Sequence, residues 1–316
     1  VYRSRVMEGL VALAETAARL DSTVFITGES GTGKDVLANF IHVQSTRAEA
    51  PIITVNCGAL PEALFESEFF GHERGAFTGA TALKRGLIEA ADGSSLFLDE
   101  VGEMPLTSQV KLLHFLEQGR YRRVGSTRDR AADVRVIVAT NRKLAEDVQA
   151  GRFRTDLFYR LNVISLHVPP LRERREDTQA LIEHFLTLYR ERFNRPALTL
   201  TDEARRQLES HDWPGNVREL RNTLERAAAL SNSDTIEADQ LLPASGGIDD
   251  ARASTPDTPA SPAAPLTLEE IERRHILRVL NETSGNRDRA AAILGISART
   301  LYRKLRDYET NVKFEN

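Results

Sequence analysis

The first half of the chain alternates short apolar runs with amphipathic stretches. The runs are TVFITG (23–28), PIITVNC (51–57), SSLFLDE (94–100), DVRVIVATN (133–141) and VISLHVPP (163–170). Continuous apolar runs of this length suit strands buried on both faces, and helical stretches between them suit a parallel sheet. The pattern predicts a three-layer α/β domain over residues 1–170.

The hydrophobic pattern changes twice beyond residue 170. Charged amphipathic stretches replace the strand pattern and predict a helical domain over residues 171–243. Residues 244–265 are rich in Ala, Ser, Asp and Pro and carry almost no large apolar side chains, so we expect a flexible linker there. A last, all-α domain is predicted at residues 266–316.

The last domain contains two short helical stretches joined by a glycine-containing turn. The stretches cover residues 286–295 and 297–308. Two short helices with a tight turn between them are typical of a DNA-binding helix-turn-helix. The second stretch has an apolar face and an opposite basic face at helical spacing. The expected DNA-binding residues are Arg299, Thr300, Arg303, Lys304 and Arg306.

Composition narrows the class of protein. The formal net charge of −4 does not favour nucleic-acid binding by the whole chain, so the basic patch is local. No apolar run approaches the roughly 20 residues of a membrane helix, and the single cysteine excludes an internal disulfide. We therefore expect a cytoplasmic protein without a membrane partner. The chain starts at Val1, so we also expect it to be a segment of a longer protein.

Residues 28–35, GESGTGKD, follow the first apolar run and precede a helical pattern. Glycines here let backbone N–H groups surround phosphates, and Lys34 would neutralise their charge. A generic phosphate loop ends in Ser or Thr, whereas Asp35 ends this one; a carboxylate can still help to hold Mg²⁺. The alternative is a glycine-rich turn without a ligand. The predicted nucleotide-binding residues are Gly28, Glu29, Ser30, Gly31, Thr32, Gly33, Lys34, Asp35 and Val36.

Two acidic residues end the third apolar run. Asp99 and Glu100 would emerge at the carboxyl edge of the sheet, where α/β folds bind ligands. Taken alone, such a pair is equally consistent with a solvated turn. Beside a phosphate loop, however, Asp99 would hold Mg²⁺ and Glu100 would polarise the attacking water.

Six stretches resemble the motifs of one family, the bacterial enhancer-binding proteins. These are AAA+ transcription activators that work with the sigma-54 form of RNA polymerase. The stretches are GESGTGKD, VNCGALPEALFESEFFGHERGAFTGA (55–80), SLFLDEVGEMP, RTDLFYRLNV (154–163), PPLRER (169–174) and WPGNVREL (213–220). The resemblance covers nearly all of residues 1–242, and the C-terminal stretch is similar to the Fis-type helix-turn-helix of this family. GAFTGA is the most specific motif, and an acid at position 35 agrees with the GKE that usually ends the family's phosphate loop.

The resemblance implies roles that spacing does not reveal. Asn56 would hold Glu100 inactive, and Arg154 and Arg160 would be arginine fingers that reach the nucleotide site of a neighbouring subunit. The remaining implied residues are Thr140 and Asn141 as a sensor of the γ-phosphate, Arg218 as a lid sensor, and Gly75, Ala76, Phe77, Thr78, Gly79 and Ala80 as the contact with sigma-54.

The implied function is ATP-dependent activation of transcription. A homo-oligomeric ring, a hexamer with a dimer as its inactive form, would hydrolyse ATP with Mg²⁺ and remodel the closed complex of the sigma-54 RNA polymerase holoenzyme while bound to enhancer DNA. Two alternatives stay open at this point. One is an AAA+ protein-remodelling chaperone with a DNA-localising tail, and the other is a repressor whose ATPase domain only controls assembly. The target promoters and the sensed signal cannot be predicted.

Overall fold

The computed structural model divides into two compact units, Val1–Gly246 and Gly247–Asn316. It describes residues 1–231, 233–241, 276, 287–294, 297, 300, 301 and 303–305. The predicted linker, Arg299 and Arg306 lie outside these residues. Within the described ranges, no helix is both long enough and apolar enough to cross a membrane.

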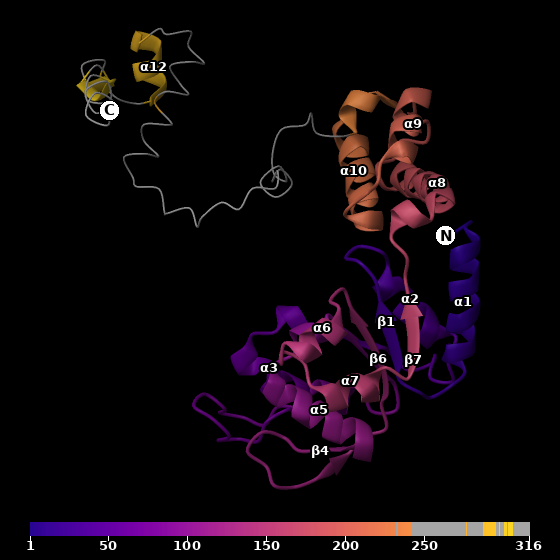
Figure 1. Ribbon diagram of the computed structural model, residues 1–316, viewed down its shortest axis with the longest axis vertical. Coiled ribbons are helices and arrows are strands. Elements are labelled where there is room, and N and C mark those ends of the chain that lie inside the picture. The colour runs from indigo at the N-terminus through magenta and orange to yellow at the C-terminus, as the bar shows by residue number, and fades with distance from the viewer. Residues whose placement is uncertain are drawn as a thin grey trace. The chain divides into compact units, whose positions relative to one another are not determined.

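A parallel sheet of five strands forms the centre of the first unit, in the order β2-β3-β6-β1-β7 (Figure 1). Each strand lies inside one of the five apolar runs, so the predicted parallel α/β architecture is confirmed. A small antiparallel ribbon, β4 with β5, is inserted before β6. The bounds are β1 (Val24–Thr27), β2 (Ile53–Asn56), β3 (Ser95–Asp99), β4 (Arg120–Tyr121), β5 (Arg130–Ala131), β6 (Arg135–Thr140) and β7 (Ile164–His167).

Helices cover both faces of the sheet, and this explains the unbroken apolar runs. In β6, Val136 and Val138 pack into one core, while Ile137 and Ala139 pack into the core on the other face. Helices α1 (Arg5–Ala18) and α2 (Lys34–Val43) cover the second of these faces, and α1 stands apart from α3, α5 and α7 in Figure 1. The remaining helices of this part are η1 (Cys57–Ala59), α3 (Glu62–Phe70), α4 (Leu87–Ala90), η2 (Val101–Glu103), α5 (Leu106–Gln118), α6 (Leu144–Gln149) and α7 (Thr155–Leu161).

A helical lid follows the sheet and has a core of its own. Trp213 belongs to this core, with 1% of its surface exposed, and its Nε1 donates to the Leu208 carbonyl at 2.9 Å. The lid also contains two strands of two residues each, which are too short to leave a pattern in the sequence. Its elements are η3 (Leu171–Glu173), α8 (Arg175–Arg192), β8 (Thr199–Leu200), α9 (Asp202–Ser210), α10 (Asn216–Leu230), β9 (Thr235–Ile236) and η4 (Ala238–Gln240).

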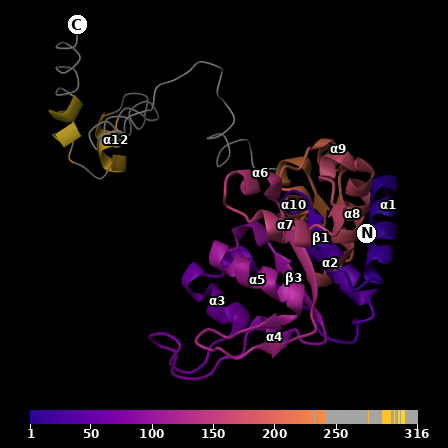
Figure 2. The same ribbon diagram turned by 60° about the horizontal axis from the view of Figure 1, so that its bottom comes forward.

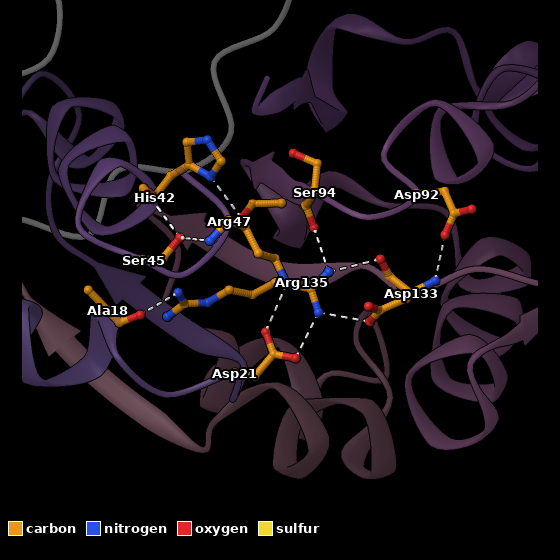
Figure 3. A network of polar contacts seen from close by, with 10 residues as sticks. Ala18, Asp21, His42, Ser45, Arg47, Asp92, Ser94, Asp133 and Arg135 are labelled. Carbon is orange, nitrogen blue, oxygen red and sulfur yellow. Dashed lines mark hydrogen bonds and ion pairs between the residues drawn. The ribbon is translucent and has the colours of Figure 1, made fainter. Parts of the chain in front are cut away.

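Two arginines tie together the amino edge of the sheet (Figure 3). Arg47 donates to the carboxylates of Asp21 and Asp133, with each closest contact at 2.8 Å, and also to the Ser94 carbonyl. Arg135 is buried and donates to the carbonyls of Ala17 and Ala18, at 2.7 and 2.8 Å, in the last turn of α1. The last carbonyls of a helix lack partners within it. The Ala17 carbonyl also accepts from the Leu20 N–H, so Arg135 adds a donor there, supplies one to the Ala18 carbonyl, and holds α1 against the start of β6.

The described part of the second unit is helical. Helix α12 (Arg287–Leu294) buries Ala291 and exposes Arg287 and Arg289. In the second predicted helix, Leu301 is buried and Arg303 is exposed, as the expected apolar and basic faces require. The Thr300 N–H donates to the Ser297 hydroxyl at 3.1 Å, which is the hydrogen bond expected at a helix start.

Candidate nucleotide-binding site

The loop between β1 and α2 has a backbone that glycine alone accommodates at two positions. A Cβ at Gly28 would lie 2.6 Å from the Val168 carbonyl oxygen, and a Cβ at Gly31 would lie 2.4 Å from the Gly215 carbonyl oxygen. Both residues have positive φ, as does Gly33 directly before α2. The loop therefore leads into the amino terminus of α2, whose first N–H groups have no partner within the helix and favour an anion.

Lys34 lies under this loop. Its Nζ donates to the carbonyls of Gly28 and Glu29 at 3.0 and 2.9 Å, and the side chain is buried. Burial lowers the pKa of Lys34, while the charge of Asp99 acts in the opposite direction. An ammonium group held against a glycine loop and facing carboxylates fits the binding of a polyphosphate with Mg²⁺.

The acidic pair lies at the neighbouring strand end. Asp99 ends β3 beside Asn56, the last residue of β2, and burial raises the pKa of Asp99 although Lys34 opposes this. Glu100 follows with a φ of 54°, a conformation that costs a non-glycine residue energy and is often found at functional sites. The Glu100 N–H donates to Asp99 Oδ1 at 3.0 Å.

Asn56 and Glu100 meet at Gly58. A Cβ on Gly58 would lie 2.9 Å from Glu100 Oε2 and 3.4 Å from Asn56 Oδ1, so a larger residue would separate the two side chains. Asn56 Oδ1 accepts from the Ala59 N–H at 3.1 Å. In the described part of the chain, Asn56 and Glu100 are neighbours but share no direct hydrogen bond.

The end of β6 completes this edge. Thr140 is buried and pairs with Thr27, the residue before the phosphate loop, and the exposed Asn141 follows. Because β6 lies between β3 and β1, the sensor residues implied by the resemblance lie between the acidic pair and the loop.

The lid closes directly on the phosphate loop. Arg172 pairs with both carboxylate oxygens of Glu29, at 2.5 and 2.8 Å, and this pairing lowers the pKa of Glu29 to about 2. Asn216 is fully buried, and its Nδ2 donates to Glu29 Oε2 and to the Ser30 carbonyl. Arg218 donates to Ser30 Oγ at 2.9 Å, and a hollow of about 500 Å³ lies beside these two residues.

No role is predicted from the sequence for Arg172 or Asn216. Both stand inside stretches that carry the family resemblance, PPLRER and WPGNVREL. Asn216 has a φ of 54°, which asparagine tolerates better than most residues. An asparagine after Pro-Gly is therefore a weak signal for a special backbone position, although its distant partner Glu29 cannot be predicted.

Arg154 and Arg160 are not brought to this site. Arg154 caps α7 and forms an ion pair with Asp156 in the first turn of that helix, with Nη2 at 2.6 Å from Oδ2. Arg160 donates to the Leu116 carbonyl at 2.6 Å. In the part of the chain that the structure describes, neither arginine hydrogen bonds to the phosphate loop.

Four of the predicted nucleotide-binding residues are exposed, namely Ser30, Asp35, Val36 and Arg218. Asp35 is exposed in the first turn of α2, and Val36 beside it is 69% exposed. Asp35 still interacts electrostatically with Lys34 and Asp99, so it lies in the field of the site.

The GAFTGA residues form the tip of a loop between α3 and α4 that projects from the domain (Figure 2). The Phe77 ring is 39% exposed and packs edge-on against the His72 ring, with 5.0 Å between centroids. Gly75, Thr78 and Gly79 are exposed, while Ala80 is buried. Ala76 packs closely against Gly125, which lies between β4 and β5. A Cβ added at Gly125 would be 2.6 Å from the Cβ of Ala76.

Comparisons with known proteins agree with this arrangement. The chain is 46% identical over 305 residues to the alginate biosynthesis transcriptional regulatory protein AlgB of Pseudomonas aeruginosa, covering 96% of this chain and 66% of that protein. It is 45% identical to the transcriptional regulatory protein ZraR of Escherichia coli, covering 96% of this chain and 68% of that protein. The chain thus spans about two thirds of the length of these relatives.

The fold is also similar to a solved structure. NtrX from Brucella abortus, crystallised in complex with ADP, matches with a TM-score of 0.75 and 35% identity over 97% of this chain and 68% of that chain. The same protein in complex with ATP matches with a TM-score of 0.73.

Three family models match successive parts of the chain. The AAA+ ATPase lid domain matches residues 172–256, and the bacterial regulatory protein, Fis family, matches residues 267–308. The third model, the sigma-54 interaction domain, matches residues 1–167, more than half of the chain. The resemblance seen in the sequence is confirmed, and the chain belongs to the sigma-54 interaction domain family.

Proposed function

We propose that this protein is an ATPase that activates sigma-54 RNA polymerase. The observation that carries the proposal is the convergence of Lys34, Asp99 and Glu100 at one edge of the sheet, under a lid that contacts the same loop. Enhancer DNA, the polymerase holoenzyme and further copies of the chain would be its partners, and it would act in the cytoplasm. The domains follow our sequence boundaries, with the ATPase part at residues 1–170, the lid at 171–243, the linker at 244–265 and the DNA-binding domain at 266–316.

The residues of the site fit ATP with Mg²⁺. The loop from Gly28 to Val36 would hold the phosphates, with Lys34 as the point charge, and Asp99 and Asp35 would hold the metal, which supplies further neutralisation of phosphate charge. Glu100 has no hydrogen-bond partner for its carboxylate among the described residues, so this carboxylate is available to accept a proton from water. Asn56 and the Thr140-Asn141 pair would position that water and sense the γ-phosphate.

Arg154 and Arg160 would act on a neighbouring subunit. Arg154 caps α7 and pairs with Asp156, and Arg160 lies on α7 and donates to the Leu116 carbonyl of α5, so both have partners away from their own phosphate loop. Guanidinium groups match the charge that develops on a transferred phosphoryl group, and an arginine supplied from outside can raise the rate by orders of magnitude. A homo-oligomeric ring, which we propose to be a hexamer formed from inactive dimers, would supply them.

The GAFTGA loop would transmit the motion to sigma-54. Phe77 is held by one ring contact and remains partly exposed, so it can leave His72 for a partner at modest cost. DNA binding would come from Thr300, Arg303 and Lys304, together with Arg299 and Arg306.

Open-complex formation on a supercoiled sigma-54 promoter tests the proposal, with ATP hydrolysis measured in parallel. Phe77→Ala or Thr78→Ala should abolish promoter opening while hydrolysis stays close to wild type, because the loop lies downstream of the nucleotide site. Leu83→Ala is a matched control, since Leu83 is a 50% exposed apolar residue on the same loop. Normal opening by the Phe77 and Thr78 variants would contradict the assignment of the loop.

A further inference from the structure

The carboxylate of Asp177 joins the start of α1 to the lid. Asp177 lies in the first turn of α8 and is completely buried. It accepts hydrogen bonds from the N–H groups of Arg3 and Ser4 at 2.5 and 2.7 Å, and from the Ser4 hydroxyl at 2.9 Å. Ser4 also caps α1, and both views place the amino terminus beside α8 (Figures 1 and 2).

Arg174 continues this contact to the phosphate loop. Its side chain is 5% exposed, its Nη1 lies 3.9 Å from Asp177 Oδ2, and its Nη2 donates to the Thr32 carbonyl at 2.8 Å. Its Nε is buried and has no hydrogen-bond partner among the described residues. The guanidinium is therefore held mainly by Asp177 on one side and by the phosphate loop on the other.

The Thr32 carbonyl controls a phosphate-binding group. The peptide between Thr32 and Gly33 is planar, so a hydrogen bond that fixes the Thr32 C=O also fixes the Gly33 N–H, which points in the opposite direction. N–H groups of such a loop are the donors that hold phosphates. If Arg174 shifted, this peptide would be free to rotate and a phosphate donor would lose its orientation.

We propose that Asp177 and Arg174 are positioning residues, through which the docking of Arg3 and Ser4 on the lid sets the conformation of the phosphate loop. The proposal rests on the nucleotide binding proposed above and adds a regulatory input to it. A partner or ligand that pulled the start of α1 away from α8 would remove up to three hydrogen bonds from Asp177 and weaken nucleotide binding from outside the site.

Ser4→Ala and Thr201→Ala test this as a matched pair. Each removes a helix-capping hydroxyl, because Thr201 caps α9 by accepting from the Ala204 N–H, but Ser4 alone also binds Asp177. In the full chain, Ser4→Ala should raise the Kd for ADP with Mg²⁺ and the KM for ATP by about tenfold, which corresponds to one lost hydrogen bond to a charged group. The kcat at saturating ATP should stay near wild type. Thr201→Ala should lower the melting temperature similarly without changing either constant, and Ser4→Thr should restore the affinity.

A double-mutant cycle supplies the second measurement. If the two residues act in series, Asp177→Asn combined with Arg174→Met should weaken ADP binding no more than the stronger single change does. Wild-type affinity in folded Ser4→Ala protein would overturn the proposal, and so would equal weakening by Thr201→Ala or full additivity in the cycle. If Asp177→Asn does not fold, the comparison of ADP affinity between Ser4→Ala and Thr201→Ala still tests the proposal. Absence of ADP binding by the wild-type chain would instead contradict the proposed function itself.

Discussion

The two edges of the central sheet are both rich in charge, yet they differ in how that charge is satisfied. At the amino edge, Arg47 and Arg135 each donate to several acceptors, and the carboxylates of Asp21 and Asp133 are paired (Figure 3). At the carboxyl edge, the Asp99 carboxylate accepts from one backbone N–H, and that of Glu100 has no hydrogen-bond partner among the described residues.

This difference distinguishes a structural network of charges from a reactive site: in the first the charged groups have partners within the protein, and in the second they have few. Folding favours the pairing of partly buried charges, because an unpaired one costs several kcal/mol. Where the carboxylates are paired in this way, little of their charge remains for a ligand. Where Lys34, Asp99 and Glu100 share one edge with few partners, the remaining charge and hydrogen-bonding capacity are available to a polyphosphate and a metal. We therefore expect substitutions at the two edges to have different consequences.

The largest effect is expected for Glu100→Gln. The substitution keeps the shape of the side chain but removes its ability to take a proton, so kcat should fall by about 10²- to 10⁴-fold. ATP affinity should stay near wild type. Single-turnover hydrolysis and equilibrium binding of ATP separate the two quantities, and a loss of affinity as large as that of Lys34→Ala would contradict the assigned roles.

Lys34→Ala should chiefly weaken binding. No other ammonium group lies under the phosphate loop in the described structure, so we expect nucleotide affinity to fall by at least about 100-fold, the loss of a strong charge-assisted contact. Arg47→Ala is the control from the amino edge. It should lower thermal stability and leave nucleotide affinity unchanged, whereas equal weakening by both variants would remove the contrast between the edges.

Arg135→Met should affect stability alone. The change removes the only side-chain donor of the Ala18 carbonyl and leaves the Ala17 carbonyl with backbone N–H donors alone, which should cost about 1–3 kcal/mol in the free energy of unfolding. Urea unfolding with and without ADP measures both properties. The increment of stability that ADP provides should be the same as in the wild type, and a smaller increment would show that the amino edge also influences the site.

The smallest effect concerns pH and the contact between lid and loop. The pKa of Glu29 is lowered from 4.5 to about 2 in the folded protein, mainly by Arg172. The corresponding stabilisation is complete above pH 4.5 and is lost as the pH falls towards 2. Because this ion pair is solvent-exposed, we expect at most about 1 kcal/mol. Glu29→Gln should be less stable than wild type at pH 6, and the difference should shrink as the pH falls from 4.5 to 2; a difference independent of pH would contradict the role of this pair.

Much of the fold could be predicted because its signals are local. The five strands lie inside apolar runs, since a strand covered on both faces must be apolar at successive positions. The strands β8 and β9 were not predicted, because each is only two residues long and such a short segment shows no periodicity.

The site was predictable only in part, because only some of its residues are marked by a local signal in the sequence. Lys34, Asp99 and Glu100 each follow a strand signal, and parallel strands bring their carboxyl ends to one edge, so sequence order already implies their proximity. The contacts of Arg172, Arg174, Asn216 and Asp177 had no such signal. Their partners Glu29, Thr32, Ser30 and Ser4 lie more than 140 residues away along the chain.

By itself, therefore, the sequence determined the five strands of the central sheet, the positions of the phosphate loop and the acidic pair, and the family that the motifs resemble. Each of these depends on periodicity or on spacing within one segment. Tertiary structure alone decided which charges were already satisfied and how the lid meets the loop. It placed Asp177 of α8 against the start of α1, and it left Arg154 and Arg160 away from their own site. These contacts join side chains that are far apart in the sequence. Such side chains come close to one another only when the cores of the sheet and the lid pack.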